Sequence, residues 1–321
     1  MRKVFAALLF IITTNLTLFA QQEAQFSQNM FNIMAINPGY AGANDAICAT
    51  ILARQQWSGF KDPDGESTAP QTFLLSLDAP IRFLHGGLGL TISQDELGFE
   101  KNLGVKLAYA YHINVGIGRL QIGLQGSFLD KTIDVNKFKP IDQGDQVLLN
   151  WQSNITTDFG FGMYYFIKEK VYAGFSTSQL SESTVENTST PSTFSLTRHY
   201  YIQGGYQWTL PSNPSFQFLP SVLVKTDFTS AQYDINALLL YNNRFWGGLS
   251  YRIQDAVVIL LGMNWKNFKF GYSYDLTTSA IGSEGRSSGS HEIMLRYCFT
   301  IKIPVYETEY HNSRFFDDIK K

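Results

Sequence analysis

The chain has 321 residues, with 25 basic and 27 acidic side chains and a formal net charge of −2 at pH 7. This balance, without a basic stripe, argues against a nucleic-acid-binding surface. Aromatic residues make up 15% of the chain and charged residues only 16%, whereas soluble proteins average about 25% charged residues. Such an aromatic-rich, charge-poor composition is typical of a transmembrane β-barrel, because one face of each strand meets lipid and the other a polar lumen.

The first twenty residues have the three-part pattern of a secretory signal peptide. Arg2 and Lys3 precede an apolar run from Val4 to about Leu18, and Ala20 stands before a polar stretch. The pattern predicts a signal peptide over residues 1–20, cleaved after Ala20. A retained membrane anchor is the alternative, but the apolar run is short and interrupted by polar residues.

The rest of the chain alternates apolar and polar residues with period two, in short segments bounded by Gly, Pro, Asn or Asp. We count about fourteen segments, and closed bacterial barrels have an even number of strands. The sequence therefore predicts an all-β fold, a transmembrane antiparallel β-barrel of about 14 strands over residues 46–301. The segments begin near Ala46, Gln71, Gly86, Lys101, Gly118, Thr157, Val171, His199, Phe216, Gln232, Phe245, Ala256, Phe268 and His291.

Apolar and charged residues separate by parity within these segments. In the fourth segment, the residues expected to face lipid are Val105, Leu107, Tyr109, Tyr111 and Ile113, and those expected to face the lumen are Lys106, Ala108, Ala110 and His112. In the last segment, Ile293, Leu295, Tyr297, Phe299 and Ile301 oppose Glu292, Arg296 and Thr300. A charge on the lipid face would cost about 2–4 kcal/mol at mid-membrane, so the charges must share the lumen parity.

The connections between segments alternate in length. Even-numbered connections are all short, and the long ones fall on odd positions, at Ser58–Pro70, Thr132–Thr156, Gln179–Arg198 and Asp275–Ser290. Bacterial barrels have short periplasmic turns and longer extracellular loops. We therefore expect an outer-membrane protein with both termini in the periplasm, including a C-terminal tail over residues 302–321. A soluble β-sandwich is the alternative, and it gives no reason for this parity.

No pattern of residues indicates chemistry. The five histidines are spread along the chain, and none pairs with another His or with Cys at metal-ligand spacing. The motifs HExxH, CxxC and the P-loop do not occur in the sequence. We expect no catalytic, metal-binding or cofactor-binding residues and no cofactor. An outer-membrane enzyme, the alternative, would need Ser, His and Asp to converge at the outer rim.

The two cysteines lie at the two ends of the predicted barrel. Cys48 is near the start of the first segment and Cys298 near the end of the last, both with lumen parity. Because a closed barrel places its first and last strands side by side, we expect the two cysteines to lie close across this seam. The envelope is oxidising, but barrel shear can offset the pair, so the sequence leaves the bond open.

Several blocks, in order, resemble a known family. The first two are QFSQNMFN (Gln25–Asn32) and NPGYAG (Asn37–Gly42), followed by RQQWSGF (Arg54–Phe60), GGLGLTISQDELG (Gly86–Gly98), YAYHI (Tyr109–Ile113), GGLSYR (Gly247–Arg252), FGYSYDLTTSAI (Phe270–Ile281) and GSHEIMLRY (Gly289–Tyr297). Together they resemble the PorP/SprF family, outer-membrane proteins of Bacteroidota linked to the type IX secretion system and, in some members, to gliding motility. The chain has NPGYAG where the family form is NPAYAG.

The resemblance implies a non-enzymatic barrel that works within a larger assembly. Its partners would be type IX secretion components or a large secreted surface adhesin, with membrane lipid around the barrel. The alternative is a transporter of small solutes whose N-terminal segment acts as a movable plug. A barrel of this size needs side chains or a plug to fill it, so we expect no open pore.

The N-terminal segment, residues 21–45, is too polar for a lipid-facing strand and too apolar for a free tail. We expect it at or in the periplasmic mouth, as a plug, as a periplasmic docking surface, or as both. The residues expected to form the plug or contact a partner are Gln25, Phe26, Ser27, Gln28, Met30, Phe31, Asn32, Asn37, Pro38, Tyr40, Gly42, Arg54, Trp57 and Asp275. Arg54 and Trp57 also fit ordinary lumen or girdle positions, and Asp275 with the loop after it is a candidate contact for a secreted partner.

Overall fold

The computed structural model describes residues 23–61, 65, 68–133, 154–186, 193–279 and 287–299. The signal peptide predicted over residues 1–20 and the tail predicted over residues 302–321 lie outside this part of the chain. Within it, no helix is long and apolar enough to span a membrane.

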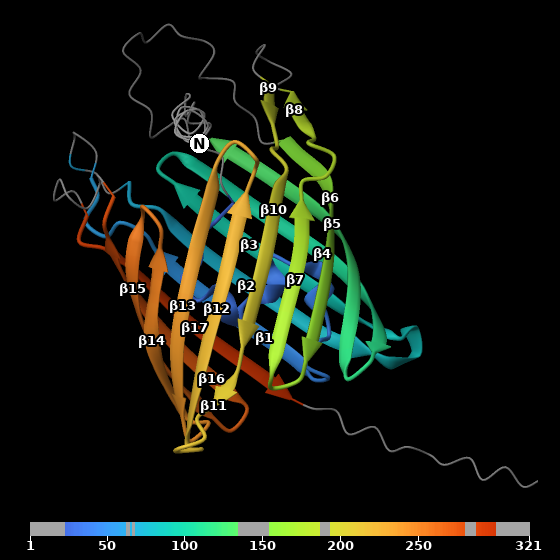
Figure 1. The fold of residues 1–321 in the computed structure, drawn as a ribbon. Helices are drawn as coiled ribbons and strands as arrows, with labels where there is room; N and C mark the ends of the chain where they lie inside the picture. Colours follow the sequence, from blue (N-terminus) through green and yellow to red (C-terminus); the bar gives the residue numbers. More distant parts are fainter. Residues whose placement is uncertain are drawn as a thin grey trace, which may run out of the picture.

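Fourteen strands close into an antiparallel barrel (Figure 1). They are β1 (Ile47–Gln55), β2 (Gln71–Ile81), β3 (Gly86–Leu97), β4 (Glu100–Val115), β5 (Gly118–Ile133), β6 (Asn154–Ile167), β7 (Val171–Ser178), β10 (His199–Tyr206), β12 (Phe216–Thr226), β13 (Ala231–Tyr241), β14 (Phe245–Arg252), β15 (Ala256–Trp265), β16 (Phe268–Thr277) and β17 (Ser290–Phe299). Pairing of β1 with β17 and of β10 with β12 completes the ring. The predicted barrel of about 14 strands is confirmed, and each strand begins within three residues of its expected start.

A few short elements lie outside the ring of strands. Strands β8 (Thr184–Glu186) and β9 (Thr193–Ser195) form a separate hairpin in the connection between β7 and β10, and β11 (Trp208–Thr209) pairs with β12. The only helical elements in the described part of the chain are the 3₁₀ turns η1 (Asn29–Phe31), η2 (Ile33–Ala35), η3 (Pro38–Tyr40) and η4 (Arg82–Leu84). None of these elements has a period that the sequence could reveal, because each covers three residues or fewer.

The two faces of the strands follow the predicted parity. Leu107 and Tyr111 on β4 point outward and are about half exposed, at 53% and 47%, whereas Ala108 and Ala110 point inward and are buried. On β17 the same alternation exposes Ile293 at 61% and leaves Glu292 with no exposure. The middle of the outer face is thus apolar, and Lys106 and Glu292 lie on the lumen face, as a lipid-embedded barrel requires.

The two ends of the barrel differ in their connections. At one end, here called the short-turn end, tight turns join neighbouring strands, and Gly116 and Ile117 alone connect β4 to β5. Gly116 adopts a φ of 59°, which suits glycine in such a turn. At the other, here called the long-loop end, β7 and β10 are joined through the β8–β9 hairpin, at the top of Figure 1.

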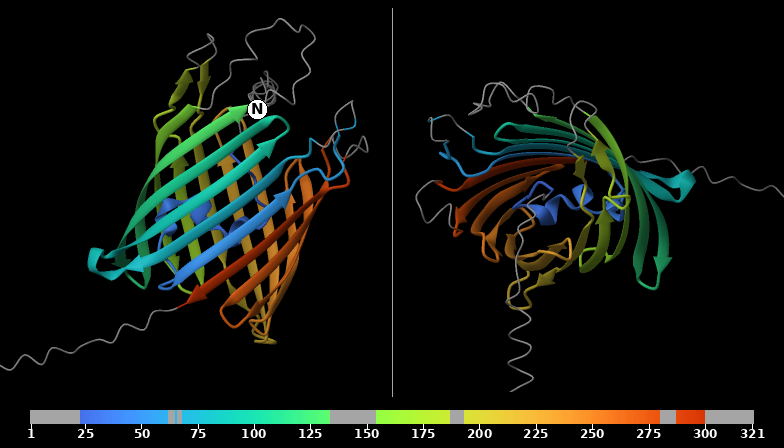
Figure 2. Two further views of the ribbon diagram at one scale, coloured as in Figure 1. Left: turned by 180° about the vertical axis from the view of Figure 1, so that it is seen from behind. Right: turned by 90° about the horizontal axis from the view of Figure 1, so that it is seen from above.

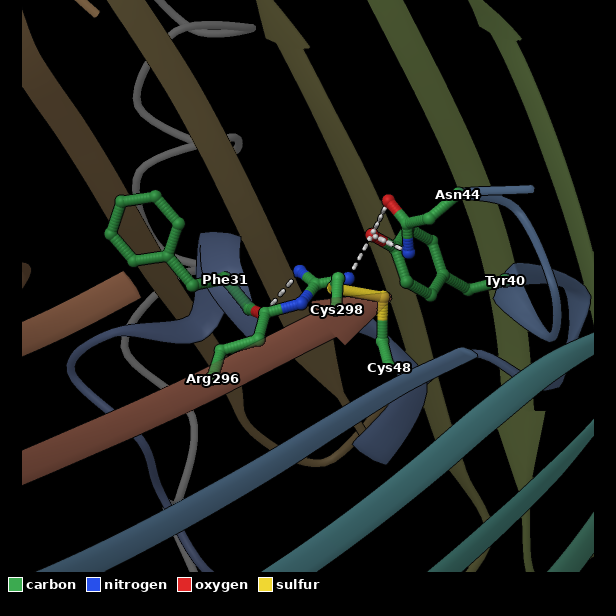
Figure 3. Close-up of a disulfide and its surroundings, with 6 residues drawn as sticks. All are labelled: Phe31, Tyr40, Asn44, Cys48, Arg296 and Cys298. Carbon is green, nitrogen blue, oxygen red and sulfur yellow. Dashed lines mark hydrogen bonds between the residues drawn. A yellow bond between two sulfur atoms is a disulfide. The ribbon is translucent and has the colours of Figure 1, made fainter. Parts of the chain in front are cut away.

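The seam between the first and last strands carries a disulfide. The β1–β17 register places Cys48 opposite Cys298, and the two form a bond with their Cα atoms 4.1 Å apart (Figure 3). The bond lies at the short-turn end, where β1 begins and β17 finishes. The sequence left the bond open, and the structure contains it.

Candidate functional site

The residues from Glu23 to Ala46, here called the lumen segment, lie inside the barrel, as the view along its axis in Figure 2 shows. Glu23 contacts Lys106 in the half of the lumen nearer the long-loop end, and Asp45 pairs with Arg119 at 2.8 Å at the short-turn end. The segment therefore lies at the short-turn mouth and extends from there across the lumen. The two termini themselves, both predicted to be periplasmic, lie outside the described residues.

A cluster of buried charges holds Ser27 of the lumen segment. The Ser27 hydroxyl donates to Asp275 at 2.7 Å and accepts from Arg54 Nη1 at 2.8 Å. The backbone N–H groups of Ser27 and Gln28 donate to the two Glu292 carboxylate oxygens, each at 2.8 Å. Arg54 also pairs with Asp275 at 2.8 Å and Glu292 at 3.3 Å. Because buried charges are tolerated only when paired and hydrogen-bonded, the wall and the segment depend on each other here.

Arg252 on β14 extends this charge cluster to the neighbouring strands. Its guanidinium pairs with Asp234 at 3.1 Å, Asp255 at 3.0 Å and Asp275 at 3.4 Å. The Asn29 side chain of the lumen segment donates to Asp234 at 3.3 Å. Arg252 is 2% exposed, so these carboxylates are its counter-charges in a site with little water.

Glu23 anchors the beginning of the lumen segment. Its carboxylate pairs with Lys106 at 3.1 Å and accepts from the Tyr201 hydroxyl at 2.7 Å, while Lys225 donates to its backbone carbonyl at 2.8 Å. Burial alone would raise the pKa of the Glu23 carboxyl, but the positive charges of Lys106, His199 and Lys225 outweigh burial and hold that pKa well below its usual range. Glu23 is therefore ionised at neutral pH.

Glycines on the inner wall let the lumen segment approach the strands closely. A Cβ atom at Gly123 would lie 2.4 Å from the carbonyl carbon of Pro38, and one at Gly162 would lie 2.2 Å from the Asn37 amide oxygen. Both distances are far shorter than a van der Waals contact of about 3.5–4.0 Å. The same contact with the segment would arise at Gly87, Gly89 and Gly271. A larger side chain at Gly87, Gly123 or Gly162 would displace the segment, and at Gly89 or Gly271 it would move the Met34 or Gln28 side chain.

Asn37 fixes the segment between β6 and β7. Its amide nitrogen donates to the backbone carbonyls of Met163 at 3.0 Å and Phe175 at 3.4 Å, and its amide oxygen accepts from the N–H of Gly39 at 2.8 Å. The last bond caps the 3₁₀ turn η3, which begins at Pro38. Asn37 is fully buried, so all these bonds are made without water.

Aromatic contacts complete the fit at the short-turn side. The Phe31 ring packs on Trp246 with centroids 4.6 Å apart, and the Lys269 ammonium lies 4.3 Å from the Phe31 centroid, a cation–π contact. Arg296 donates to the Phe31 carbonyl at 3.3 Å and to the Tyr40 hydroxyl at 3.4 Å, beside the disulfide (Figure 3). The segment is thus held by polar and apolar contacts along its whole length.

Two cavities lie on opposite sides of the lumen segment. The larger, of about 430 Å³, is bounded by Phe26 and Ile36 of the segment and by the inner faces of β2 to β6 toward the long-loop end. The smaller, of about 170 Å³, is bounded by Met30 and Phe31 and reaches the turn around Lys170 at the short-turn end. The segment therefore divides the space inside the barrel.

Comparison with family models identifies the chain. The model described as "Type IX secretion system membrane protein PorP/SprF" matches residues 18–297. The chain belongs to the PorP/SprF family. This confirms the resemblance seen in the ordered sequence blocks, and it makes the barrel an outer-membrane protein. Comparison with curated protein sequences finds no match.

Solved structures similar to this PorP/SprF barrel are themselves outer-membrane barrels. Omp33 of Acinetobacter baumannii is 6% identical, with a TM-score of 0.44 over 79% of this chain and 99% of that chain. A deletion mutant of the monoaromatic hydrocarbon channel TodX is 8% identical, with a TM-score of 0.47 over 87% and 95%. The KdgM porin is 10% identical, with a TM-score of 0.37 over 78% and 99%. Similarity at this level carries no argument about what this chain does.

The structure places the predicted site residues of this PorP/SprF protein in different surroundings. The buried ones of the lumen segment are Ser27, Gln28, Asn32, Asn37, Pro38, Tyr40 and Gly42, and the half-buried ones are Gln25, Phe26, Met30 and Phe31. All eleven lie within the barrel, so in this arrangement they offer no external docking surface. Trp57 lies apart from them in the β1–β2 connection, where its backbone N–H donates to the Ser290 hydroxyl at 3.0 Å.

Asp275 requires a correction. It was expected to contact the plug or a secreted partner, and its side chain is buried and bonded to Ser27 of the lumen segment and to Arg54 and Arg252, so it faces the lumen rather than an external partner. Its position just before an exposed connection suggested that it is exposed, but its parity on β16 points its side chain into the lumen. Among the described residues, no group of three or more His, Cys, Asp or Glu side chains is placed to hold a metal ion.

Several residues that hold the segment were not singled out from the sequence. They are Glu23, Asp234, Arg252 and Glu292. Lumen parity was predicted for Glu292, and Arg252 falls within the GGLSYR block, so charge at a lumen position was the available signal. The sequence could not show that these charges meet Ser27, which lies 265 residues from Glu292 along the chain.

Proposed function

We propose that this protein is a non-enzymatic outer-membrane component of the type IX secretion system. It connects to the secretion machinery or supports the secretion and anchoring of a large surface adhesin. The short-turn end faces the periplasm and the long-loop end faces the outside, as in other bacterial barrels. Family membership supports the secretion role. The fixed lumen segment is the observation that supports a closed barrel working in an assembly rather than a transporter.

The contacts of the lumen segment favour a permanent closure over a movable plug. Withdrawing it would leave Arg54, Asp275 and Glu292 without the Ser27 and Gln28 groups that complete their hydrogen bonds. Disrupting one buried charged group typically costs about 3–5 kcal/mol. A solute transporter needs a plug that leaves readily, whereas an assembly component needs a rigid, sealed barrel.

The test combines partner recovery with secretion. A C-terminally tagged chain would be purified from native outer membranes in mild detergent, beside an untagged strain, and a deletion strain would be assayed for surface-protein export. Recovery of secretion components or of one large surface protein, together with loss of export on deletion, is the expected result. A partnerless barrel from a strain with normal export would overturn the proposal.

Conductance distinguishes the transporter alternative. In planar bilayers, the wild-type barrel is expected to show no steady solute-sized conductance, because the lumen segment divides the interior. Stable channels in the wild type, or solute uptake that depends on this protein in cells with intact export, would favour a transporter.

A further inference from the structure

The larger cavity has the size and construction of a binding site. Its volume of about 430 Å³ falls within the range of about 300–1,000 Å³ that small-ligand sites occupy. One side is apolar and includes Phe26 and Ile36 of the lumen segment with Leu74 of β2. The cavity extends to the ends of β3, β4 and β5 at the long-loop end, where Leu97, Glu100 and Lys131 line it. A ligand would therefore reach it from that end.

A buried hydroxyl in the cavity lacks a hydrogen-bond partner. Thr91 on β3 lines the cavity and is 2% exposed, and its Oγ1 atom forms no hydrogen bond with any described residue. Leaving a buried polar group unpaired is unfavourable. The cost is recovered when a ligand group in the cavity bonds to the hydroxyl.

Negative charge exceeds positive charge among the lining residues. Four carboxylates and two lysines line the cavity: Glu23, Asp95, Glu100, Asp158, Lys106 and Lys131. Both lysines are already paired, Lys106 with Glu23 at 3.1 Å and Lys131 with Glu100 at 2.7 Å. Lys225, just outside the cavity, is turned to the Glu23 carbonyl.

The two remaining carboxylates differ in their partners. Asp158 accepts backbone N–H groups from Phe159, Ser181 and Ser183. Asp95 accepts the Thr72 hydroxyl at 2.5 Å, and no cation of the described chain lies within ion-pair distance of it. Asp95 is therefore the carboxylate best placed to receive a positive charge from a ligand.

We infer that this cavity binds a short extended peptide carrying a basic side chain beside apolar ones, presented from the long-loop end. The basic group pairs with Asp95, a polar group of the peptide satisfies Thr91, and the apolar neighbours pack on Phe26, Ile36 and Leu74. The inference rests on the proposed function, and it specifies the chemistry of the secreted partner's contact.

The test measures peptide binding to the purified full-length barrel in detergent. The probe is the blocked tripeptide acetyl-Leu-Arg-Leu-amide, compared with the same peptide carrying Glu or Gln in place of Arg, by titration calorimetry or ligand-observed NMR. We expect the Arg peptide to bind more tightly than either of the others, and its affinity to fall as salt rises. Equal binding of the three peptides, or no binding at millimolar concentration, would overturn the inference.

Two variants locate the peptide. Asp95→Asn is expected to weaken the Arg peptide about tenfold, the effect of losing one charged hydrogen bond. Thr91→Val is expected to weaken all three peptides without lowering the stability of the free barrel, because the hydroxyl has no partner there to lose. The control is Asp45→Asn, which removes the same charge at the short-turn end and should leave binding unchanged. An Asp95→Asn effect no larger than that of Asp45→Asn would contradict the assignment.

Export separates this inference from the proposed function. If deletion abolishes surface-protein export but Asp95→Asn and Thr91→Val restore it fully, the cavity has no part in the export role and the inference fails alone. If deletion itself leaves export intact, the proposed function fails.

Discussion

At the scale of single residues, the inner-wall glycines decide whether the lumen segment fits. Replacing Gly162 with Ala would put a methyl group 2.2 Å from the Asn37 amide oxygen, so the segment or strand β6 must shift. Overpacking of this kind typically costs about 1–3 kcal/mol. We expect Gly162→Ala to lower the free energy of unfolding by that amount, measured by urea titration. Gly126→Ala is the matched control, because no atom lies within 4 Å of its added Cβ, and an equal effect of both would contradict the fit.

Glu23 gives a residue-scale prediction for pH. Its pKa in the folded protein lies below the usual value, because Lys106, His199 and Lys225 outweigh the effect of burial. A carboxyl group whose pKa is depressed in the folded protein stabilises the fold at pH values above its ordinary pKa. This stabilisation is lost as pH falls through the lowered pKa. Below about pH 4, the difference in melting temperature between wild type and Glu23→Gln should thus shrink as pH falls. The exposed Glu182→Gln is the control, and a difference that grows on acidification would refute the assignment.

At the scale of elements, the charge cluster joins the lumen segment to strands β1, β14, β16 and β17. Arg54→Ala removes the cationic partner of buried Glu292 and one of the two of buried Asp275, and should lower the free energy of unfolding by about 3–5 kcal/mol. Arg119→Ala breaks the more exposed pair with Asp45 and should cost less than about 1 kcal/mol. Denaturant titration of both variants checks the contrast. Similar losses would mean that the cluster is not what holds the segment.

The elements also show how far the sequence could predict this structure. Strands such as β4 and β17 were predicted well, because lipid keeps charges off the outer face at mid-membrane and turns interrupt the alternation. The lumen segment gave no comparable signal, since its turns η1 to η3 are three residues each and have no period. Some of its partners, such as Asp275 and Glu292, lie more than 200 residues away, and the order of residues does not reveal that they meet Ser27 in the lumen.

At the scale of the whole molecule, the segment crosses a barrel whose ring closes only when β1 pairs with β17. Residues that precede β1 therefore lie inside a ring that β1 helps to complete, and closure must occur around them. The Cys48–Cys298 disulfide holds this seam, and the two cysteines are 250 residues apart in the chain. Cross-linking so long a loop restricts the unfolded chain strongly, which in the chain-entropy account is where a disulfide has its effect.

Removing the disulfide should therefore weaken the whole barrel without changing its form. The β1–β17 register continues from Cys48 through Gln55, so backbone pairing still closes the seam when the sulfurs are lost. For the double variant Cys48→Ser/Cys298→Ser, we expect a free energy of unfolding lower by about 2–5 kcal/mol and an unchanged β-sheet circular dichroism spectrum. Reducing agent should destabilise the wild type and leave the double variant unaffected. Loss of β-structure in the variant would show that the native ring itself needs the bond, and full retained stability would show that the bond does not stabilise the barrel, because a constraint on the unfolded chain lowers stability while leaving the native ring intact.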